Sequence, residues 1–254
     1  NGGSALINNW NVSSVTNMVG MFRQATSFNR PLESWNVGSV TSMINMFRDA
    51  SAFNQPLNGW DVSNVIFMKY LFRGASAFNK PLNGWDVSSA IRMTQMFWGA
   101  SVFNQNLNSW IVSDVTDMSQ MFQGARAFNN GGSPLINNWD TSSVNTMNGM
   151  FNGAINFNQP LNNWDVSNVT NLSFTFSNAT IFNQDLSDWD TSSVTTMKAT
   201  FLNARAFNRT LTRDGNKWNT SSVITMEDMF NEARAFNNGG SALINNWDVS
   251  SVTN

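Results

Sequence analysis

The stretch that decides the fold is residues 60–84, WDVSNVIFMKYLFRGASAFNKPLNG. Its opening tryptophan recurs along the whole chain at intervals of 25 or 29 residues, at Trp10, Trp35, Trp60, Trp85, Trp110, Trp139, Trp164, Trp189, Trp218 and Trp247. Self-similarity at such a period is typical of repeat architectures, in which each unit buries its apolar side against its neighbours. We therefore interpret the chain as about nine copies of one unit.

The apolar spacing within one unit predicts two short elements. The segment Leu57-x-x-Trp60-x-Val62 alternates as a short strand does, with apolar side chains on one face. From Val65 onward the spacing suits one face of a short helix or 3-10 turn, and Ser63 is placed to act as its N-cap. The 29-residue units carry four extra residues, such as NGGS at 130–133, and this single insertion point predicts a loop that lies off the core.

Stacking the units predicts ladders of identical side chains along the core. Tryptophan is expected to pack on tryptophan in a column that includes Trp35, Trp60, Trp85 and Trp110. Asparagine follows the second phenylalanine of every unit, and its amide can satisfy backbone groups at a buried bend. The expected asparagine ladder includes Asn54, Asn79 and Asn104.

Composition excludes several classes of function. The chain has no cysteine and no histidine, so it has neither a thiolate nucleophile nor the commonest general base and metal ligand. Its net charge of −2 shows no basic surplus, which makes nucleic acid an unexpected partner. No apolar run approaches the length of a membrane span, so we expect no direct membrane insertion of this segment. We expect no enzymatic activity and no cofactor.

The repeat resembles a known family. The pattern L-x-x-W-x-V is similar to the strand signature of leucine-rich repeats, and FNQPLNGWDVSNV at 53–65 and FNQPLNNWDVSNVTNL at 157–172 resemble the 25-residue repeat of BspA-like surface proteins. The resemblance covers the whole chain. It implies an α/β repeat that forms a right-handed parallel leucine-rich-repeat solenoid, with one short strand and one short helix or 3-10 turn in each unit of 25–29 residues. It also implies display outside the cell or on its surface.

The domain organisation follows from the same repeat. Residues 1–254 are expected to form a single array, with no second domain. Residues 1–17 and 238–254 carry nearly the same sequence and neither resembles a polar cap, so we expect a fragment of a longer array without its caps.

A row of aspartates follows the tryptophan column. Asp140, Asp165 and Asp190 occupy the same place in adjacent units and are weak candidates for a metal site, because hard cations such as calcium favour oxygen ligands. The competing interpretation is that each carboxylate accepts hydrogen bonds from the following serine in an Asx-turn. No dense acidic loop is present, so no specific metal site is predicted.

Large apolar residues at positions that are usually polar are the candidates for an interface, since exposed aromatic side chains commonly anchor protein contacts. They are Phe67, Tyr70, Trp98, Ile111, Phe174 and Ile181. The expected function is a non-catalytic surface for adhesion or protein–protein interaction, with a protein or glycan ligand. The alternative is a structural subunit that self-associates into an extracellular filament, sheath or surface layer.

Overall fold

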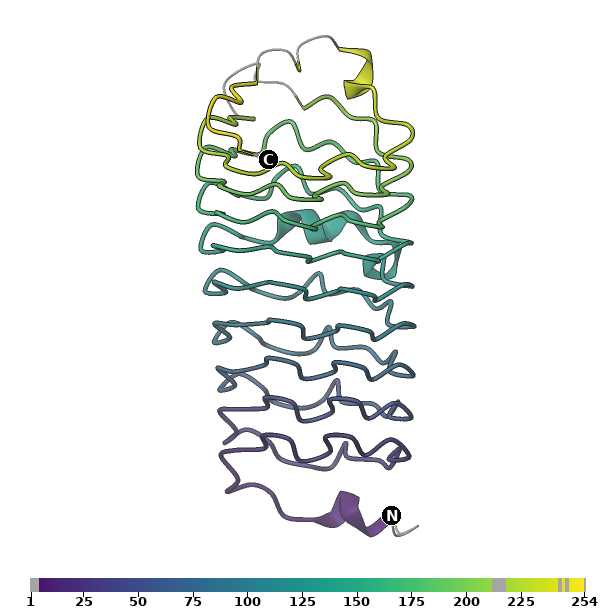
Figure 1. Ribbon diagram of the computed structural model, residues 1–254. Coiled ribbons are helices and arrows are strands. Elements are labelled where there is room, and N and C mark those ends of the chain that lie inside the picture. The colour runs from purple at the N-terminus through teal and green to yellow at the C-terminus, as the bar shows by residue number, and fades with distance from the viewer. Residues whose placement is uncertain (1–4, 212–217, 242–243, 245–246, 254) are drawn as a thin grey trace.

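The units stack one above another along a single axis. The computed structural model describes residues 5–211, 218–241, 244 and 247–253. The N-terminal unit lies at one end of the stack and the C-terminal units lie at the other (Figure 1). One residue of each unit pairs in parallel with its equivalent in the next, through single bridges that run from Asn17–Ser42 to Thr196–Thr225. The chain is therefore a repeat structure with one continuous core.

Regular secondary structure is sparse and lies at the insertions. Within the described ranges there is no α-helix and no strand, and the elements are four 3-10 helices: η1 (Ala5–Asn9), η2 (Asn130–Gly132), η3 (Pro134–Asn138) and η4 (Asn238–Gly240). None of the helices in the described part of the chain has the length and hydrophobicity needed to cross a bilayer. The predicted α/β repeat, with one short strand in each unit, is therefore wrong, since the described residues form no strand and few helices.

The strand prediction at 57–62 is wrong because the chain turns there. The backbone N–H of Trp60 donates to the carbonyl of Leu57 at 3.0 Å, which closes a turn immediately before the tryptophan. Leu57, Trp60 and Val62 are all buried, with at most 2% of each residue exposed. The alternating apolar pattern thus marks buried positions on either side of a turn, and no strand forms there.

The prediction of a short helix or 3-10 turn from Val65 is met only in part: bonds to the carbonyl three residues earlier recur, but they close separate turns, because residues 66–74 give half of their hydrogen bonds to the next unit. The N–H groups of Tyr70, Phe72 and Gly74 donate to the carbonyls of Thr94, Met96 and Trp98 at 2.7–3.0 Å. The N–H groups of Leu71, Arg73 and Ala75 donate instead to the carbonyls three residues earlier in the same unit and close turns. We call residues 66–74, and their equivalents in other units, the pairing segment.

Two residues of each pairing segment have left-handed backbone conformation. In the unit of Trp60 they are Tyr70, at φ 61°, and Gly74, at φ 69°. The first position holds Phe174 and Ala199 in later units, with φ of 59° and 52°. Residues with a Cβ avoid this region, at a cost of about 1–2 kcal/mol each. The conformation persists because it lets turn bonds alternate with bonds to the neighbouring unit.

The core consists of aligned aromatic columns. Two phenylalanine columns run the length of the stack, with ring centroids 5.6 Å apart between Phe47 and Phe72 and 5.9 Å apart between Phe53 and Phe78. The two columns stack on each other at 4.1 Å within a unit, as Phe72 does on Phe78. Such offset stacking adds about 0.5–1.5 kcal/mol per pair to the free energy of burial.

The tryptophan column is also stacked and is fixed by hydrogen bonds. Trp35 and Trp60 lie nearly parallel, with centroids 6.3 Å apart. The indole N–H of Trp60 donates to the carbonyl of Leu32 at 2.9 Å, and that of Trp85 donates to Leu57 at 2.8 Å. The same bond recurs at Trp35, Trp110, Trp139, Trp164, Trp189, Trp218 and Trp247. Each indole therefore ties its unit to the preceding one.

The asparagine column follows the second phenylalanine. The side-chain oxygen of Asn54 accepts the backbone N–H of Asn79 at 3.0 Å, and that of Asn79 accepts from Asn104 at 2.9 Å. The bond recurs from Asn29 to Asn237 in every adjacent pair of units. These amides satisfy backbone donors that the bend leaves without a turn partner.

The four-residue insertion is anchored in the core. Asn130 of NGGS is completely buried, which corrects the expectation that the whole loop lies off the core. Its side-chain oxygen accepts from the N–H of Leu107 at 2.8 Å, and its amide donates to Asn108 and Ser133 at 2.8 Å. The equivalent Asn238 repeats the bonds to Leu211 and Ser241. The insertion thus preserves the register of the stack.

Two glycine substitutions test the left-handed positions. Gly99 has φ 69°, and the nearest atom to an added Cβ lies 3.8 Å away, so only the backbone conformation opposes a side chain. Gly99→Ala should lower the free energy of unfolding by about 1–2 kcal/mol. The control is Gly59→Ala, since no atom lies within 4 Å of its added Cβ, and it should be neutral or stabilising by up to about 1 kcal/mol. Urea denaturation measures both, and equal changes would contradict the left-handed assignment.

Removing the buried amide of the insertion tests its anchoring role. Asn130→Ala leaves the N–H of Leu107 without its acceptor, so the free energy of unfolding should fall by about 1–3 kcal/mol. Asn138→Ala, at an exposed position of η3, is the matched control and should change it by less than about 0.5 kcal/mol. A loop without a structural role would show no difference between the two variants in urea denaturation.

Candidate binding surface

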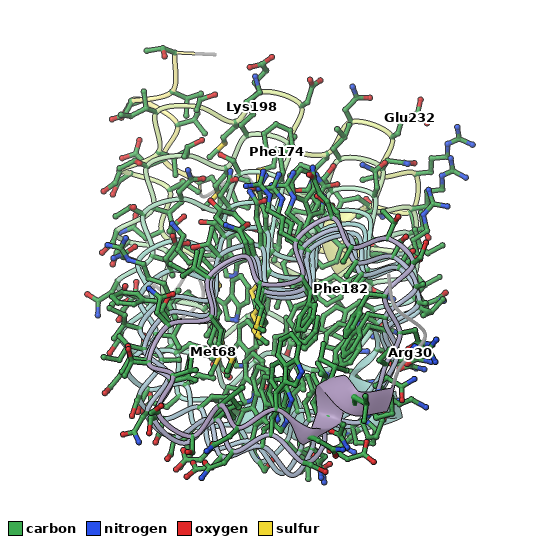
Figure 2. The ribbon with its side chains drawn as sticks, turned by 90° about the horizontal axis from the view of Figure 1, so that it is seen from below. Arg30, Met68, Phe174, Phe182, Lys198 and Glu232 are labelled. Atoms are coloured by element: carbon green, nitrogen blue, oxygen red, sulfur yellow. The ribbon has the colours of Figure 1, made fainter. Side chains whose placement is uncertain are left out.

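The six candidate interface residues do not form one patch. Phe67, Ile111 and Ile181 are exposed, at 38%, 58% and 47%, whereas Tyr70, Trp98 and Phe174 are half-buried. Counted from the tryptophan of their own unit, the six lie at five different positions, and only Tyr70 and Phe174 share one. Phe174 lies beside Lys198 along the outer edge of the pairing segments, away from the interior around Met68 (Figure 2). The structure brings together Tyr70 and Trp98 through Arg73, which approaches both rings.

Arg73, Arg48 and Lys69 form a cation–aromatic cluster with the two rings. The guanidinium of Arg73 lies 3.5 Å from the ring centroid of Trp98 and 5.9 Å from that of Tyr70. Arg48 and Lys69 approach Tyr70 at 5.9 and 5.4 Å. A cation over an aromatic face gains about 0.5–1 kcal/mol when it is exposed to solvent, and more when it is partly desolvated. The cluster therefore fixes the orientation of the Trp98 ring.

Arg73 is held from several sides. Its Nη1 donates to Oε1 of Gln95 at 2.7 Å. Burial, followed by the positive charge of Arg48, lowers the pKa of Arg73 below its usual value. Arginine starts so high that the guanidinium still keeps its charge at neutral pH. Arg48 has its own partner in Asp49, at 3.3 Å.

A shallow groove begins at Trp98 and continues over the next three units. Trp98 closes one end and Asn178 lines the other. Gly124 and Gly153 form the floor, and an added Cβ at Gly153 would lie only 3.7 Å from Cα of Gly124. The walls are two further columns, Gln123 with Asn152 and Arg126 with Ile155. The groove exists because Gly124 and Gly153 place no side chain between these walls.

Gln123, which lines the groove, carries one polar atom without a partner. Oε1 of Gln123 is buried and has no hydrogen-bond partner among the described residues. A buried acceptor without a donor costs about 1–3 kcal/mol, so such atoms are rare in native proteins. The sequence-based predictions include neither this acceptor nor the glycine floor. The available signal is glycine at Gly74, Gly99, Gly124 and Gly153, which recurs at the spacing of the repeat.

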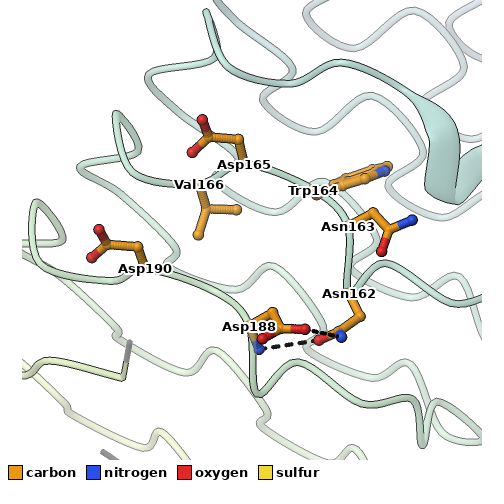
Figure 3. Close-up of a pocket in the computed structure, with 7 residues that line it drawn as sticks. All are labelled: Asn162, Asn163, Trp164, Asp165, Val166, Asp188 and Asp190. Atoms are coloured by element: carbon orange, nitrogen blue, oxygen red, sulfur yellow. Dashed lines mark hydrogen bonds between the residues drawn. The ribbon is translucent and has the colours of Figure 1, made fainter. Parts of the chain in front are cut away.

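A second groove lies along the aspartate row. Asp165 and Asp190 project from adjacent units in the same direction, while Asp188 turns toward Asn162 (Figure 3). The amide of Asn162 donates to Asp188, and the backbone N–H of Asp188 donates back to Asn162 at 3.1 Å. Within the described residues, no three acidic side chains gather closely enough to hold a metal ion. The groove therefore offers an acidic surface without a defined cation cage.

The aspartates after the tryptophans accept bonds from the serine two residues later. The hydroxyl of Ser142 donates to Asp140 at 2.6 Å, and the N–H groups of Ser167 and Ser192 donate to Asp165 and Asp190 at 2.9 and 3.0 Å. These are the Asx-turns that one interpretation of the row predicts. The serine hydroxyl, and then the serine N–H, lower the pKa of Asp140, and the same two bonds act on Asp61 and Asp86. Ser63 is thus a donor to Asp61 and not a helix N-cap.

The stack and its grooves define a class of protein: a repeat protein with aromatic ladders in its core and shallow surface grooves along its columns. The chain matches the family described as "Mycoplasma protein of unknown function, DUF285" in overlapping segments at residues 3–110, 59–135, 100–214, 132–239 and 210–254. These segments cover nearly the whole chain, and the chain belongs to this family. No curated protein matches it.

Removing one serine hydroxyl tests the origin of the lowered aspartate pKa values. The folded-state pKa of Asp61 lies below the ordinary 3.8, so its hydrogen bonds stabilise the fold above that pH. This contribution disappears as the pH falls through the folded-state pKa. Ser63→Ala should therefore destabilise the protein at neutral pH, and the difference from wild type should shrink below that pKa. The effect is small because Asp61 is exposed and solvent screens it.

The matched control is Ser13→Ala. Ser13 donates to Asn11, which takes the place of the aspartate and cannot ionise. The effect of Ser13→Ala on the free energy of unfolding should not change between acidic and neutral pH. Urea denaturation across this pH range measures both variants, and a parallel pH dependence would rule out the carboxylate as the cause.

Proposed function

We propose that this chain is a non-catalytic binding region of an extracellular or cell-surface protein, used for adhesion or protein–protein interaction. We further propose that the stack is a right-handed parallel solenoid of the leucine-rich-repeat class, close to the BspA-like surface proteins. Parallel pairing of equivalent positions in successive units supports this class. The resemblance of FNQPLNGWDVSNV at 53–65 to the BspA-like repeat supports it as well.

The observation that carries the proposed function is the contrast between the core columns and the outer columns. The core column of Phe47, Phe72 and Phe97 holds phenylalanine in every unit. Beside it, the outer column carries arginine at Arg48 and Arg73, and then tryptophan at Trp98. The fold therefore tolerates many residues at that outer position. A half-buried tryptophan held in place by arginine is typical of a binding hot spot.

The electrostatics of the acidic groups favour binding over hydrolysis. Asp61, Asp86 and Asp140 have lowered pKa values, caused first by the serine hydroxyls. A general acid that works near neutral pH needs a raised pKa. The exposed row of carboxylates thus supports a non-catalytic surface.

A structural role is the second candidate. Phe67, Ile111 and Ile181 are exposed apolar side chains at three different positions of the repeat, and none of them lines the groove that begins at Trp98. Scattered apolar groups of this kind can support lateral contacts between copies. Self-association into ordered fibres is the outcome that would favour this role.

Binding of the fluorescently labelled chain to cultured epithelial cells tests the proposed function. The expected result is saturable binding that unlabelled chain competes away. The double variant Tyr70→Gln/Trp98→Gln should weaken it about tenfold or more, because it removes both rings of the cluster. Both substitutions copy glutamines that stand at the same positions in Gln95, Gln120 and Gln123, so the fold should tolerate them.

The control variant changes an exposed apolar residue outside the cluster. Ile111→Asp copies the aspartate of Asp61 and Asp86 at the same position, and it should leave cell binding within about twofold of wild type. Absence of saturable binding would contradict the adhesion proposal. Ordered fibres of the purified chain in electron micrographs, together with absent cell binding, would establish the structural role instead.

A further inference from the structure

The geometry points to the groove between Trp98 and Asn178 as a binding site for a saccharide that carries a carboxylate, such as a uronic-acid oligosaccharide. This inference rests on the proposed binding function and names the class of ligand for one site. The groove is lined by residues of four consecutive units, from the unit of Trp85 to the unit of Trp164. It therefore offers an elongated site that runs along the axis of the stack.

The first element of the site is the tryptophan platform. Arg73 lies against the ring of Trp98, 3.5 Å from its centroid, and Cδ1 of Trp98 lies 3.9 Å from the place of an added Cβ at Gly124. The ring thus stands at the mouth of the groove in a fixed orientation. The apolar face of a pyranose ring is flat and matches such a surface, and burial of its C–H groups supplies the hydrophobic contribution.

The second element is the set of uncharged polar groups. Gln123 lines the groove, and its unpaired Oε1 lies just below the surface, so a sugar hydroxyl can supply the missing donor when the side chain rotates toward the ligand. Asn152 and Asn178 add amide groups along the same groove, and they are joined to each other by a 3.4 Å bond that a ligand hydroxyl can replace. Amides accept from and donate to hydroxyls equally well, which suits a ligand that carries many hydroxyls.

The third element is a cation without a counter-charge. Arg126 is exposed, lines the groove, and makes no ion pair with any described residue. No acidic side chain among the described residues lines the groove. An arginine fork recognises a carboxylate with two parallel hydrogen bonds, so the ligand that uses this residue best carries a carboxylate.

The groove does not suit an added peptide strand or a nucleic acid. Its floor donors are already used, because the N–H groups of Gly124 and Gly153 donate to Asn152 and Ser177 at 2.7 and 2.8 Å. A peptide would thus find no free ladder of backbone groups to pair with. A single arginine in the groove and a net charge of −2 provide too little positive charge to hold a phosphate backbone.

Calorimetric titration of the full chain with a hyaluronan hexasaccharide tests the site, since this probe alternates uronic acid with a neutral sugar. We expect saturable binding to one site. Trp98→Gln and Arg126→Ser should each weaken it about tenfold or more. Arg126→Ser copies Ser76 and Ser101 at the same position of earlier units. Neutral, fully N-acetylated chitohexaose should bind at least about tenfold more weakly than the acidic hexasaccharide, because it lacks the carboxylate.

The matched control for charge is Arg205→Thr. Arg205 occupies the same position as Arg126 in a later unit but does not line the groove, and the substitution copies Thr180. It should change the affinity by less than about twofold. Equal weakening by Arg126→Ser and Arg205→Thr would reveal unspecific attraction to a polyanion and would overturn the site. Absence of saturable binding, or equal affinity for the neutral sugar, would also overturn it.

The result separates this inference from the proposed function. If cells bind the chain in a Trp98-dependent manner but the hexasaccharide does not bind, the adhesion function stands and the saccharide assignment is wrong. Loss of cell binding after protease treatment of the cells would then identify a protein partner. If the hexasaccharide binds at Trp98 and cells do not, the site stands and the adhesion proposal fails.

Discussion

Every buried indole N–H needs an acceptor, and this requirement fixes how the units stack. Trp60 reaches the carbonyl of Leu32 and Trp85 reaches that of Leu57, each 28 residues earlier and three residues before the tryptophan of the adjacent unit. A buried N–H without an acceptor costs about 1–3 kcal/mol, so a stack that slips by one residue loses this bond in each unit that slips. The flat phenylalanine columns tolerate sliding much better than a hydrogen bond does. The tryptophans therefore set the register, and the phenylalanines contribute most of the remaining aromatic burial.

The same register accommodates both unit lengths. Trp139 donates to Leu107 and Trp218 to Leu186, across the 29-residue units, with distances of 3.2 and 2.7 Å. The extra residues are absorbed at the edge, where Asn130 enters the core and takes over the hydrogen bonds of the displaced backbone. The hydrogen bonds between pairing segments continue across the same insertion, since the N–H of Phe122 donates to the carbonyl of Met150 at 2.9 Å. Surface variation can thus accumulate at insertions and outer columns without disturbing the core.

Much of the core could be predicted from the sequence, whereas the backbone conformation could not. The recurrence of Trp60, Phe72 and Phe78 identifies the buried columns, because aromatic residues that recur at a fixed period are typical of a core shared by stacked units. The left-handed residues carry no such signal, since Tyr70 and Phe174 are types that normally avoid this conformation. Only bonds to the neighbouring unit, which no single unit contains, hold them there. For this reason the sequence predicts an extended strand and a helix where the chain makes successive turns.

The candidate site was predictable to a similar extent. Trp98 breaks the column of Arg48 and Arg73 and could be singled out from the repeat alone. The groove beside it depends on the missing side chains of Gly124 and Gly153 in an adjacent column, and on the position of Gln123. Which columns lie side by side can be judged only once the turns between them are known. Ile111 and Ile181 break the pattern just as clearly, but they do not line this groove.

Hydrogen exchange at the indole nitrogens, followed by NMR, tests the stacking register most directly. The indole N–H of Trp60 and of Trp85 should exchange more than about a hundredfold more slowly than that of Trp98, because opening them requires separation of adjacent units. Trp98 is half-buried and its indole N–H makes no hydrogen bond to any described residue, so it serves as the internal reference. Exchange of Trp60 and Trp85 as fast as that of Trp98 would contradict a stack held in register by its tryptophans.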